Sequence, residues 1–258
     1  MDIIGKLRII RPKLIPNPIW RKIKSLKNYK LVPGPLTYNQ DGLATRHNAD
    51  FIQNERFRRA YALGKATGSW GKVDVHWRAH VACWAAQKGL SVEGDFVECG
   101  VNRGGLARTV LDYVDLCSTS RKFFLLDTFE GLVDRYISED ERKLGIRQGG
   151  YEDCFEDVKR RFEPFQNVVL IRGAVPETLS AVTSDHIAYL SIDMNCVAPE
   201  IAAAEYFWPK LSSGAVIVLD DYGWSKHIMQ KQAFDSFAEA HGVQVLSLPT
   251  GQGIMIKP

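Results

Sequence analysis

The chain has 258 residues, of which 45% are hydrophobic and 24% are charged, and its formal net charge is +3. This composition excludes a disordered chain, fits one large α/β domain with or without an appendage, and gives no sign of a nucleic-acid partner. Five cysteines without a C-x-x-C pair indicate neither a disulfide framework nor a zinc site. The sequence contains no run of about 18 uncharged apolar residues that would predict a transmembrane helix. Charges and prolines interrupt the apolar runs at the N-terminus, so no signal peptide is predicted, and we expect a cytoplasmic protein.

The N-terminal part of the chain differs in charge from the rest. Residues 1–40 hold nine Lys or Arg and one acid, a charge of +8, which leaves −5 for the other 218 residues. Such an arm suits an acidic partner, an anionic membrane surface or packing on its own domain or on a sister subunit. We expect a basic N-terminal arm and helical extension or lid over residues 1–90, and the arm suggests a homo-oligomer.

Two helices are predicted before residue 90, from apolar residues at helical spacing. They cover residues 51–66 and 75–88, and Gly89 closes the second. The second helix carries Arg78 and His80, which either reach the functional site or are structural.

From Gly94 onward, predicted strands alternate with predicted helices. The strands are expected at 95–99, 122–127, 167–172, 187–193 and 214–221, and the helices at 104–115, 151–162, 176–182, 199–211 and 227–241. Continuous apolar strands such as KFFLLD and AVIVLD are typical of a parallel sheet buried on both faces. A final hairpin, 243–248 with 254–257, replaces the helix of a simple doubly wound fold. This layout is that of class I S-adenosylmethionine-dependent methyltransferases, an α/β Rossmann-like fold over residues 91–258.

The stretch Gly94–Gly105, GDFVECGVNRGG, predicts a buried strand, a glycine turn and the start of a helix. Bare backbone and the N-terminal end of a helix favour a nucleotide-like or anionic group. The alternative is an ordinary strand-to-helix turn.

Acidic residues stand at or near the carboxyl ends of four predicted strands, where ligands bind in such sheets. They are Glu98, Asp127, Asp193, Asp220 and Asp221. Asp127 follows Gly100 by 27 residues, a position that suits a carboxylate accepting ribose hydroxyls, although it could instead cap a helix. Glu98 could meet the amino group of an amino-acid moiety, or form a salt bridge under the sheet.

Three of these carboxylates predict a metal site. Asp193, Asp220 and Asp221 end two strands that are neighbours in this layout, so their side chains should converge. Oxygen ligands without His or Cys favour Mg²⁺, Mn²⁺ or Ca²⁺ over zinc. Such a cation could lower the pKa of a substrate hydroxyl and orient it. Asp221 could instead only cap the turn that follows it.

The segments GDFVECGVNRGG, LLDTFEGL, LSIDMN and GAVIVLDDYG, with AFDSFAEAHG and the terminal hairpin, resemble the macrocin O-methyltransferase family over about residues 75–258. The resemblance implies a bacterial, metal-dependent class I enzyme that methylates sugar hydroxyls of macrolides and related products. It places Asp193, Asp220 and Asp221 on the metal, Mg²⁺ or Mn²⁺. The candidate residues for binding S-adenosylmethionine are Glu98, Gly100, Asn102, Arg103, Gly104, Asp127, Thr128, Gly173, Ala174 and Asp193.

The chain departs from the family pattern at two places. Asn195, Cys196 and Val197 stand where the family commonly has a second acid followed by Leu-Tyr, so the acceptor pocket should differ. The turn after Gly105 lacks the hydroxyl residue often available to the donor carboxylate, so backbone amides, Asn102 or Arg103 would have to serve.

The base that removes the acceptor proton is predicted among residues near the acidic turn. The candidates are His227 and the carboxylate of Asp193, with Lys226 as another nearby group. Tyr222, Trp224 and the insertion Glu130–Gly150 are candidates for the acceptor wall. Within that insertion, the EDERK run is expected to be solvated.

These observations together predict an S-adenosylmethionine-dependent, Mg²⁺-dependent O-methyltransferase acting on a hydroxyl of a small sugar-bearing or polyol natural product. One alternative is an NAD(P)-dependent sugar dehydrogenase or epimerase, which is weakened because G-x-x-x-G-G is not G-x-G-x-x-G. The other is a non-catalytic nucleoside-binding scaffold, which has no need of Asp193 and Asp220 together.

Overall fold

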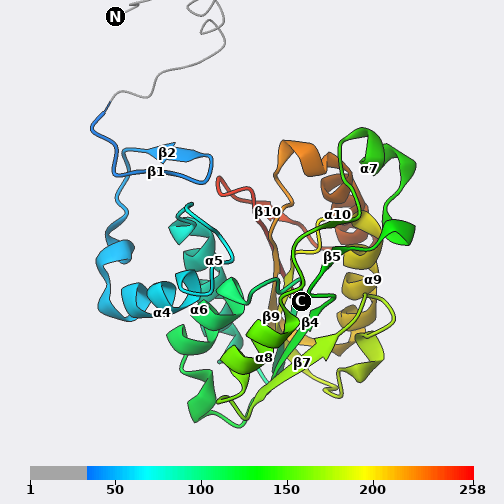
Figure 1. The fold of residues 1–258 in the computed structure, drawn as a ribbon, viewed down its shortest axis with the longest axis horizontal. Coiled ribbons are helices and arrows are strands. Elements are labelled where there is room, and N and C mark those ends of the chain that lie inside the picture. The colour runs from blue at the N-terminus through cyan, green and yellow to red at the C-terminus, as the bar shows by residue number, and fades with distance from the viewer. Residues whose placement is uncertain (1–33) are drawn as a thin grey trace, which may run out of the picture. The chain divides into compact units, whose positions relative to one another are not determined.

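The computed structural model describes residues 34–258 (Figure 1). The predicted basic arm therefore lies almost wholly outside the described residues. The described residues divide into two units, one with residues 34–39 and 44–48 and the other with residues 40–43 and 49–258. Thr37 N donates to Thr45 O at 3.0 Å within the smaller unit. The short strands β1 (Tyr38–Gln40) and β2 (Leu43–Thr45) each contain residues of both units.

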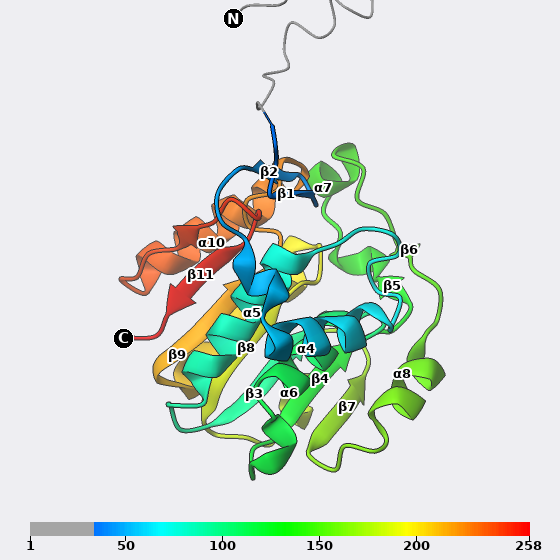
Figure 2. The same cartoon turned by 90° about the vertical axis from the view of Figure 1, so that its left-hand side faces the viewer.

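The larger unit is built on one seven-stranded sheet with the order β10-β11-β9-β8-β3-β4-β7. Figure 2 shows most of these strands side by side. The strands of this sheet are β3 (Asp95–Cys99), β4 (Phe123–Asp127), β7 (Val168–Arg172), β8 (Ile187–Ile192), β9 (Leu211–Leu219), β10 (Leu246–Ser247) and β11 (Gly253–Ile256). From β9 to β7 all neighbours are parallel, whereas β11 pairs antiparallel with both β9 and β10. The predicted class I fold, with its C-terminal hairpin, is confirmed.

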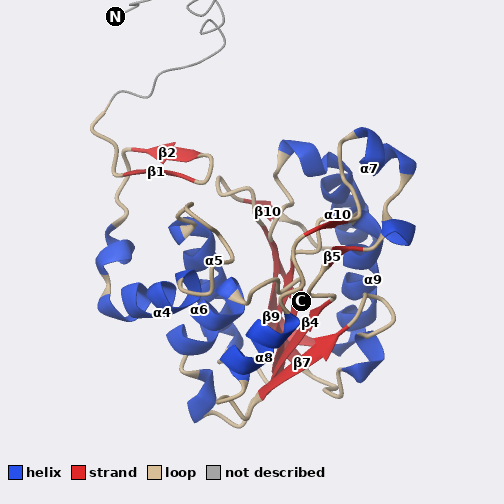
Figure 3. Ribbon diagram, in the orientation of Figure 1, coloured by secondary structure: helices blue, strands red, loops and turns tan. Residues whose placement is uncertain are grey.

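The central strands are buried because helices cover both faces of the sheet (Figure 3). The helices are α4 (Glu55–Lys65), α5 (His76–Gly89), α6 (Gly105–Tyr113), α8 (Phe155–Phe162), α9 (Val197–Phe207) and α10 (Ile228–Ala240). One apolar core joins α4, α5 and α6 to one face of the sheet, and a second joins α9 and α10 to the other. Among residues 34–258, no helix combines the length and the apolar character needed to span a bilayer.

The helices predicted at 51–66 and 75–88 form as α4 and α5, and they belong to the same compact unit as the sheet. They differ in burial: α4 is amphipathic, with Phe57, Ala60 and Tyr61 on its buried side, whereas α5 is buried over most of its surface. Both elements therefore position residues beside the sheet.

One predicted helix is wrong, because residues 176–182 contain only the short 3-10 helix Leu179–Ala181. The Thr178 hydroxyl donates to Ala174 O at 3.0 Å, and Val182 is already extended. A side-chain hydrogen bond to the local backbone competes with helix formation in this way.

The insertion between β4 and α8 is ordered, and the prediction that its EDERK run is solvated is wrong for one residue. It contains the strands β5 (Gly131–Leu132) and β6 (Gly149–Gly150) and the helix α7 (Glu139–Lys143). Glu141 in α7 is only 4% exposed, and its Oε1 accepts a hydrogen bond of 2.7 Å from Val197 N at the start of α9. This contact ties the insertion to the edge of the sheet where β8 ends.

Candidate functional site

The turn from β3 into α6 has the geometry expected of the GDFVECGVNRGG segment. Gly100 has φ +93°, and a Cβ there would stand 1.8 Å from Asp193 O. Only glycine allows the ends of β3 and β8 to approach this closely. Gly104 has φ +83° and precedes the first residue of α6, where a Cβ would meet the ring of Phe162 at 2.5 Å.

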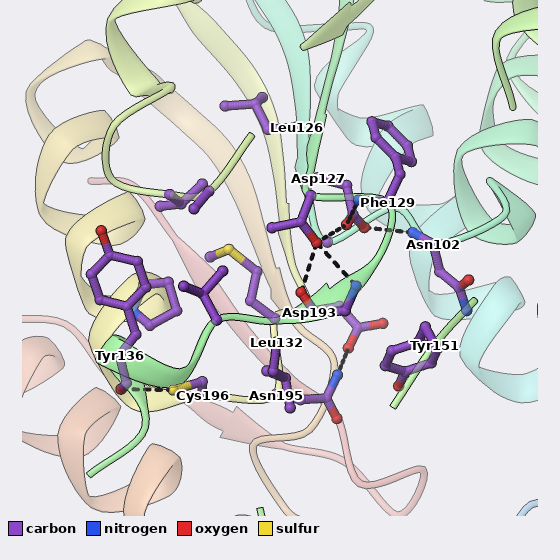
Figure 4. A pocket seen from close by; sticks show the side chains of 18 of the residues that line it. Asn102, Leu126, Asp127, Phe129, Leu132, Tyr136, Tyr151, Asp193, Asn195 and Cys196 are labelled. Carbon is purple, nitrogen blue, oxygen red and sulfur yellow. Dashed lines mark hydrogen bonds between the residues drawn. The ribbon is translucent and has the colours of Figure 1, made fainter. Parts of the chain in front are cut away.

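Asp127, at the end of β4, organises this turn. One carboxylate oxygen accepts from Val101 N at 2.5 Å and Asn102 N at 2.6 Å, and the other accepts from Phe129 N at 2.7 Å (Figure 4). Three backbone donors hold the carboxylate at the mouth of a cavity that it helps to line. The predicted ribose-binding residue is thus also a structural link between β3 and β4.

A cavity opens at the carboxyl edge of the sheet, between the ends of β3, β4, β7 and β8 (Figure 4). Seven of the ten predicted donor-binding residues line it: Gly100, Asn102, Asp127, Thr128, Gly173, Ala174 and Asp193. The rest of its wall is largely apolar and comes from Leu126, Phe129, Leu132, Val133, Val175 and Pro199, with Tyr136 and Tyr151 beside them. An apolar slot with a few polar groups at its rim is the usual form of a small-molecule site.

A second cavity adjoins the first and shares Gly100, Asn102, Tyr151, Asp193 and Asn195 with it. Its other polar lining residues are Asp41, Ser69, Arg78, Glu98, Asp220 and Asp221. Arg103 and Gly104 line neither of these two cavities of the described chain. Arg103 instead pairs with Glu152 at 3.2 Å.

Glu98 lies at the floor of the second cavity. It is 2% exposed, and among the described residues its Oε2 has no hydrogen-bond partner. Burial, and then the negative charge of Asp220, raise the pKa of this carboxyl well above its usual value. A buried acceptor without a partner, facing a cavity, fits the ammonium of an amino-acid moiety.

Ser69 supplies a hydroxyl that the turn after Gly105 lacks. Its Oγ accepts from Gly105 N at 2.9 Å, at the first turn of α6, and the side chain lines the second cavity. Because Ser69 comes from the segment between α4 and α5, far away in sequence, the motif itself gave no signal for it.

The three predicted metal ligands do come to the same edge, but Arg78 lies among them. The Arg78 Nη1 contacts Asp220 Oδ2 and lies 3.4 Å from Asp221 Oδ1. The other oxygen of Asp220 accepts from Gln252 Nε2 at 2.9 Å. Within residues 34–258, no group of three His, Cys, Asp or Glu side chains is arranged to hold a metal ion. As they lie, these residues do not fit a divalent cation.

Asp193 lies where the two cavities meet, and Asn195 Nδ2 donates to its Oδ1 at 3.1 Å (Figure 4). Burial, followed by the charges of Asp220 and Asp221, raises the pKa of Asp193 well above its usual value. His227, the other predicted base, has its Nε2 3.8 Å from Asp221 Oδ2. The imidazole therefore adjoins the acidic turn but is not part of the lining of either cavity.

Glu200, in the first turn of α9, was missed by the sequence analysis. Its Oε1 accepts from Met194 N at 2.9 Å and from Gln230 Nε2 at 2.7 Å, which fixes the backbone next to Asp193. Burial raises its pKa to about 8, against the hydrogen bond from Gln230, which lowers it. The bond to Met194 is local to the turn before α9, whereas the bond from Gln230 requires the packing of α10 against α9.

Comparison with known proteins decides the family. A sequence model of the macrocin O-methyltransferase (TylF) family matches residues 79–247, more than half of the chain. The chain belongs to this family. The match covers all the predicted donor and metal residues of this TylF-family chain, and the predicted resemblance is confirmed.

Two curated relatives are natural-product O-methyltransferases. One is the 8-demethyl-8-(2,3-dimethoxy-alpha-L-rhamnosyl)-tetracenomycin-C 4'-O-methyltransferase of Streptomyces olivaceus, 30% identical over 142 residues, 51% of this TylF-family chain and 54% of the relative. The other is the demethyldecarbamoylnovobiocin O-methyltransferase of Streptomyces niveus, 30% identical over 147 residues, 52% of this chain and 55% of the relative. The alignments thus span about half the length of these relatives.

Solved structures show the same fold. The O-methyltransferase NovP has a TM-score of 0.59 at 24% identity, covering 70% of this TylF-family chain and 79% of its own. The calicheamicin methyltransferase CalS11 has a TM-score of 0.58 at 17% identity, covering 81% of this chain and 94% of its own. At these identities the likeness establishes the class I methyltransferase fold.

Proposed function

We propose that this protein is an S-adenosylmethionine-dependent O-methyltransferase that acts on a hydroxyl of a sugar-bearing or polyol natural product. The observation that carries the proposal is the pair of adjoining cavities that meet at Asp193. Family membership and the O-methyltransferases among the relatives support it. They favour it over a sugar dehydrogenase or epimerase and over a non-catalytic scaffold.

The donor is assigned to the cavity at the ends of β3 and β4, with its amino-acid end extending past Gly100 and Asn102 into the second cavity, which Glu98 and Ser69 line. When bound, S-adenosylmethionine supplies an electrophilic methyl group on a sulfonium. In this assignment Asp127 and Thr128 hold the ribose hydroxyls of the donor, and Gly173 and Ala174 line its adenine ring. Glu98 accepts a hydrogen bond from the donor's ammonium group. Asn102, Arg103, Gly104 and Ser69 are assigned to the turn that faces the donor carboxylate. The orphaned Oε2 of Glu98 is the structural feature that best supports this orientation.

The acceptor hydroxyl is assigned to the second cavity, beside Asp193. As its oxygen forms a bond to the methyl carbon, the bond between that carbon and the sulfonium sulfur would break and leave its electron pair on the sulfur. The hydroxyl would lose its proton in this step, and Asp193 is the proposed recipient. A carboxylate whose pKa is raised by burial is a stronger base near neutral pH than an ordinary aspartate. His227 is the second proposed base, because its Nε2 lies 3.8 Å from Asp221 Oδ2, next to the acidic turn.

The proposed reaction includes no step that depends on magnesium, which is the other predicted cofactor. Asp193, Asp220 and Asp221 remain the proposed ligands if a cation does bind. In the described arrangement, however, both oxygens of Asp220 already accept from protein donors, Arg78 and Gln252. Proton transfer from the acceptor hydroxyl to Asp193, as proposed above, requires no cation.

The remaining sequence predictions belong to the same proposal. Residues 51–90 would form part of the acceptor side. Tyr136 and Cys196 line the donor cavity instead, where the Cys196 thiol donates to Tyr136 O at 3.0 Å (Figure 4). A homo-oligomer and a cytoplasmic location are proposed on the sequence grounds given above.

Calorimetry with S-adenosylhomocysteine and with NADH tests the proposed donor. We expect micromolar binding of the nucleoside product and none of NADH; the reverse would overturn the proposal in favour of the dehydrogenase. Methyl transfer from labelled donor to glycosylated acceptors then tests the reaction. Asp193→Asn should abolish transfer and retain product binding, while Asp185→Asn, exposed at the opposite end of β8, should change neither.

A further inference from the structure

The acidic cluster at the ends of β8 and β9 already contains a cation, the guanidinium of Arg78. We define the cluster as Asp41, Asp193, Asp220 and Asp221, which all line the second cavity with Arg78. The Arg78 Nε donates to Asp41 Oδ2 at 2.8 Å, while Nη1 contacts Asp220 and lies 3.4 Å from Asp221. One side chain of α5 thus contacts three of the four acids.

Arg78 is a built part of this site. It is 8% exposed, and its guanidinium carbon lies 5.5 Å from the ring centroid of Trp224. Although burial lowers the pKa of an arginine, the charges of Asp220, Asp41 and Asp221 outweigh it and raise the pKa of Arg78. A guanidinium held in this way stays charged and desolvated at every pH at which the protein is folded.

Both carboxylate oxygens of Asp220 already accept hydrogen bonds from the protein. Oδ2 accepts from Arg78, and Oδ1 accepts from Gln252 Nε2 at 2.9 Å. The Gln252 side chain is fully buried, and its Oε1 accepts from the Thr250 hydroxyl at 3.0 Å. Mg²⁺ demands oxygen ligands at about 2.0–2.1 Å in octahedral geometry. A divalent ion bound between Asp220 and Asp221 would stand next to the Arg78 charge, in a partly desolvated site where repulsion is strong.

We propose that Arg78 is the resident cation of the acidic cluster and that it excludes divalent ions from Asp220 and Asp221. The site of this chain therefore differs from the metal site that its family resemblance implies. The cluster would gain a divalent ion only when the guanidinium is removed. This inference goes beyond the proposed function and does not depend on which acceptor is methylated.

Electron paramagnetic resonance of Mn²⁺ tests it on the full chain, without donor or acceptor. Free hexaaquo Mn²⁺ gives a six-line signal that is lost on binding. We expect the wild-type protein to leave this signal unchanged through the low millimolar range. Mg²⁺ and EDTA should likewise leave its thermal unfolding temperature unchanged. Stoichiometric binding of one Mn²⁺ to the wild type, lost in Asp220→Asn, would overturn the proposal.

Removal of the guanidinium should create the metal site. Arg78→Met keeps much of the side-chain volume, and we expect it to bind one Mn²⁺ at a concentration at least about tenfold lower than the wild type. Adding Asp220→Asn to this variant should abolish the gain. Arg135→Met is the matched control, because Arg135 is an exposed arginine paired with Glu177, and it should behave as the wild type.

The remaining outcomes also decide the question. If Arg78→Met folds, as judged by thermal unfolding, but gains no Mn²⁺ binding, the exclusion by Arg78 is refuted. If it does not fold, Arg78→Gln takes its place, because a glutamine removes the charge and keeps an amide that can donate to the aspartates. This variant should also gain Mn²⁺ binding that Asp220→Asn abolishes, and no gain would again refute the proposal. Calorimetry with S-adenosylhomocysteine on the wild type reports on the proposed function separately.

Discussion

At the scale of single residues, the site combines side chains that serve a ligand with side chains that hold the backbone. Asp127 belongs to both kinds, because it lines the donor cavity and accepts from three backbone amides. Glu200 belongs only to the second kind, since it reaches Asp193 through the amide of Met194. The two acids therefore make different predictions.

Asp127→Asn should weaken donor binding and the fold together. An asparagine amide has one acceptor oxygen, so it cannot accept from both sides of the turn, and we expect a loss of about 1–3 kcal/mol in the free energy of unfolding. Binding of S-adenosylhomocysteine should fall at least about tenfold. Urea unfolding and calorimetry measure the two effects. Asp134→Asn, an exposed carboxylate paired with Arg142, is the control and should change neither.

Glu200→Gln should change how stability depends on pH. The pKa of Glu200 is raised from 4.5 to about 8 on folding, so ionisation favours the unfolded chain. The wild type should therefore lose stability relative to the glutamine variant as pH rises from 4.5 to 8, and the difference should be constant above that range. Urea unfolding across pH 5–9 measures it. A difference that does not vary with pH would contradict the prediction, and Glu205→Gln, exposed on the same helix, is the control.

At the scale of elements, the insertion between β4 and α8 acts as an ordered wall because α7 is pinned to α9. Glu141 accepts from Ser138 N at 2.8 Å and Ser138 Oγ at 2.7 Å with one oxygen, and from Val197 N with the other. It thus caps α7 and the N-terminus of α9 at once. Leu132, Val133 and Tyr136 of this insertion line the donor cavity.

Glu141→Ala should release the insertion while the sheet stays folded. Loss of the acceptor leaves buried donors unpaired, at a cost of about 1–3 kcal/mol. Hydrogen exchange measured by mass spectrometry should rise in residues 131–150 and stay unchanged in β3 and β8. Glu139→Ala, exposed on the same helix, should leave the exchange of residues 131–150 as it is. Faster exchange throughout the sheet would instead mean that the insertion is part of the global core.

At the scale of the whole chain, the C-terminal hairpin completes the sheet. β11 covers the edge of β9 over four residue pairs, from Gly253–Leu219 to Ile256–Val216, and Ile254 and Met255 are buried. Without it, β9 would become an exposed, apolar edge strand. The hairpin also brings Gln252 to Asp220, so it reaches the site as well as the core.

Truncation after residue 243 should therefore abolish cooperative unfolding and promote aggregation. Removal of Pro258 alone is the control, because it leaves the pairing of β11 intact. Thermal unfolding followed by circular dichroism, with light scattering, measures both outcomes. A truncated chain that melts as cooperatively as the control would show that the hairpin is an accessory to the fold.

The sequence by itself determined the strands of the sheet and the position of its ligand edge, whereas the neighbouring positions of β8 and β9 were expected from the class I layout. Continuous apolar runs define β3, β4, β8 and β9 locally, and glycine at position 100 is required by a backbone conformation that other residues rarely adopt. The acids come at the end of these apolar runs, so their position at the carboxyl edge of the sheet follows from where each strand ends. Seven of the ten predicted donor residues therefore line one cavity.

Only the tertiary structure decided what those acids contact. Arg78, Ser69, Glu200 and Gln252 come from separate segments, and each reaches the site through the packing of a helix or strand against the sheet. Sequence patterns report which face of an element is apolar, but not which distant polar side chain fills the space beside a buried charge. The charge balance of a buried site depends on all its neighbours at once, and for that reason the sequence predicted Arg78 as a candidate for the site but not as a partner of the aspartates.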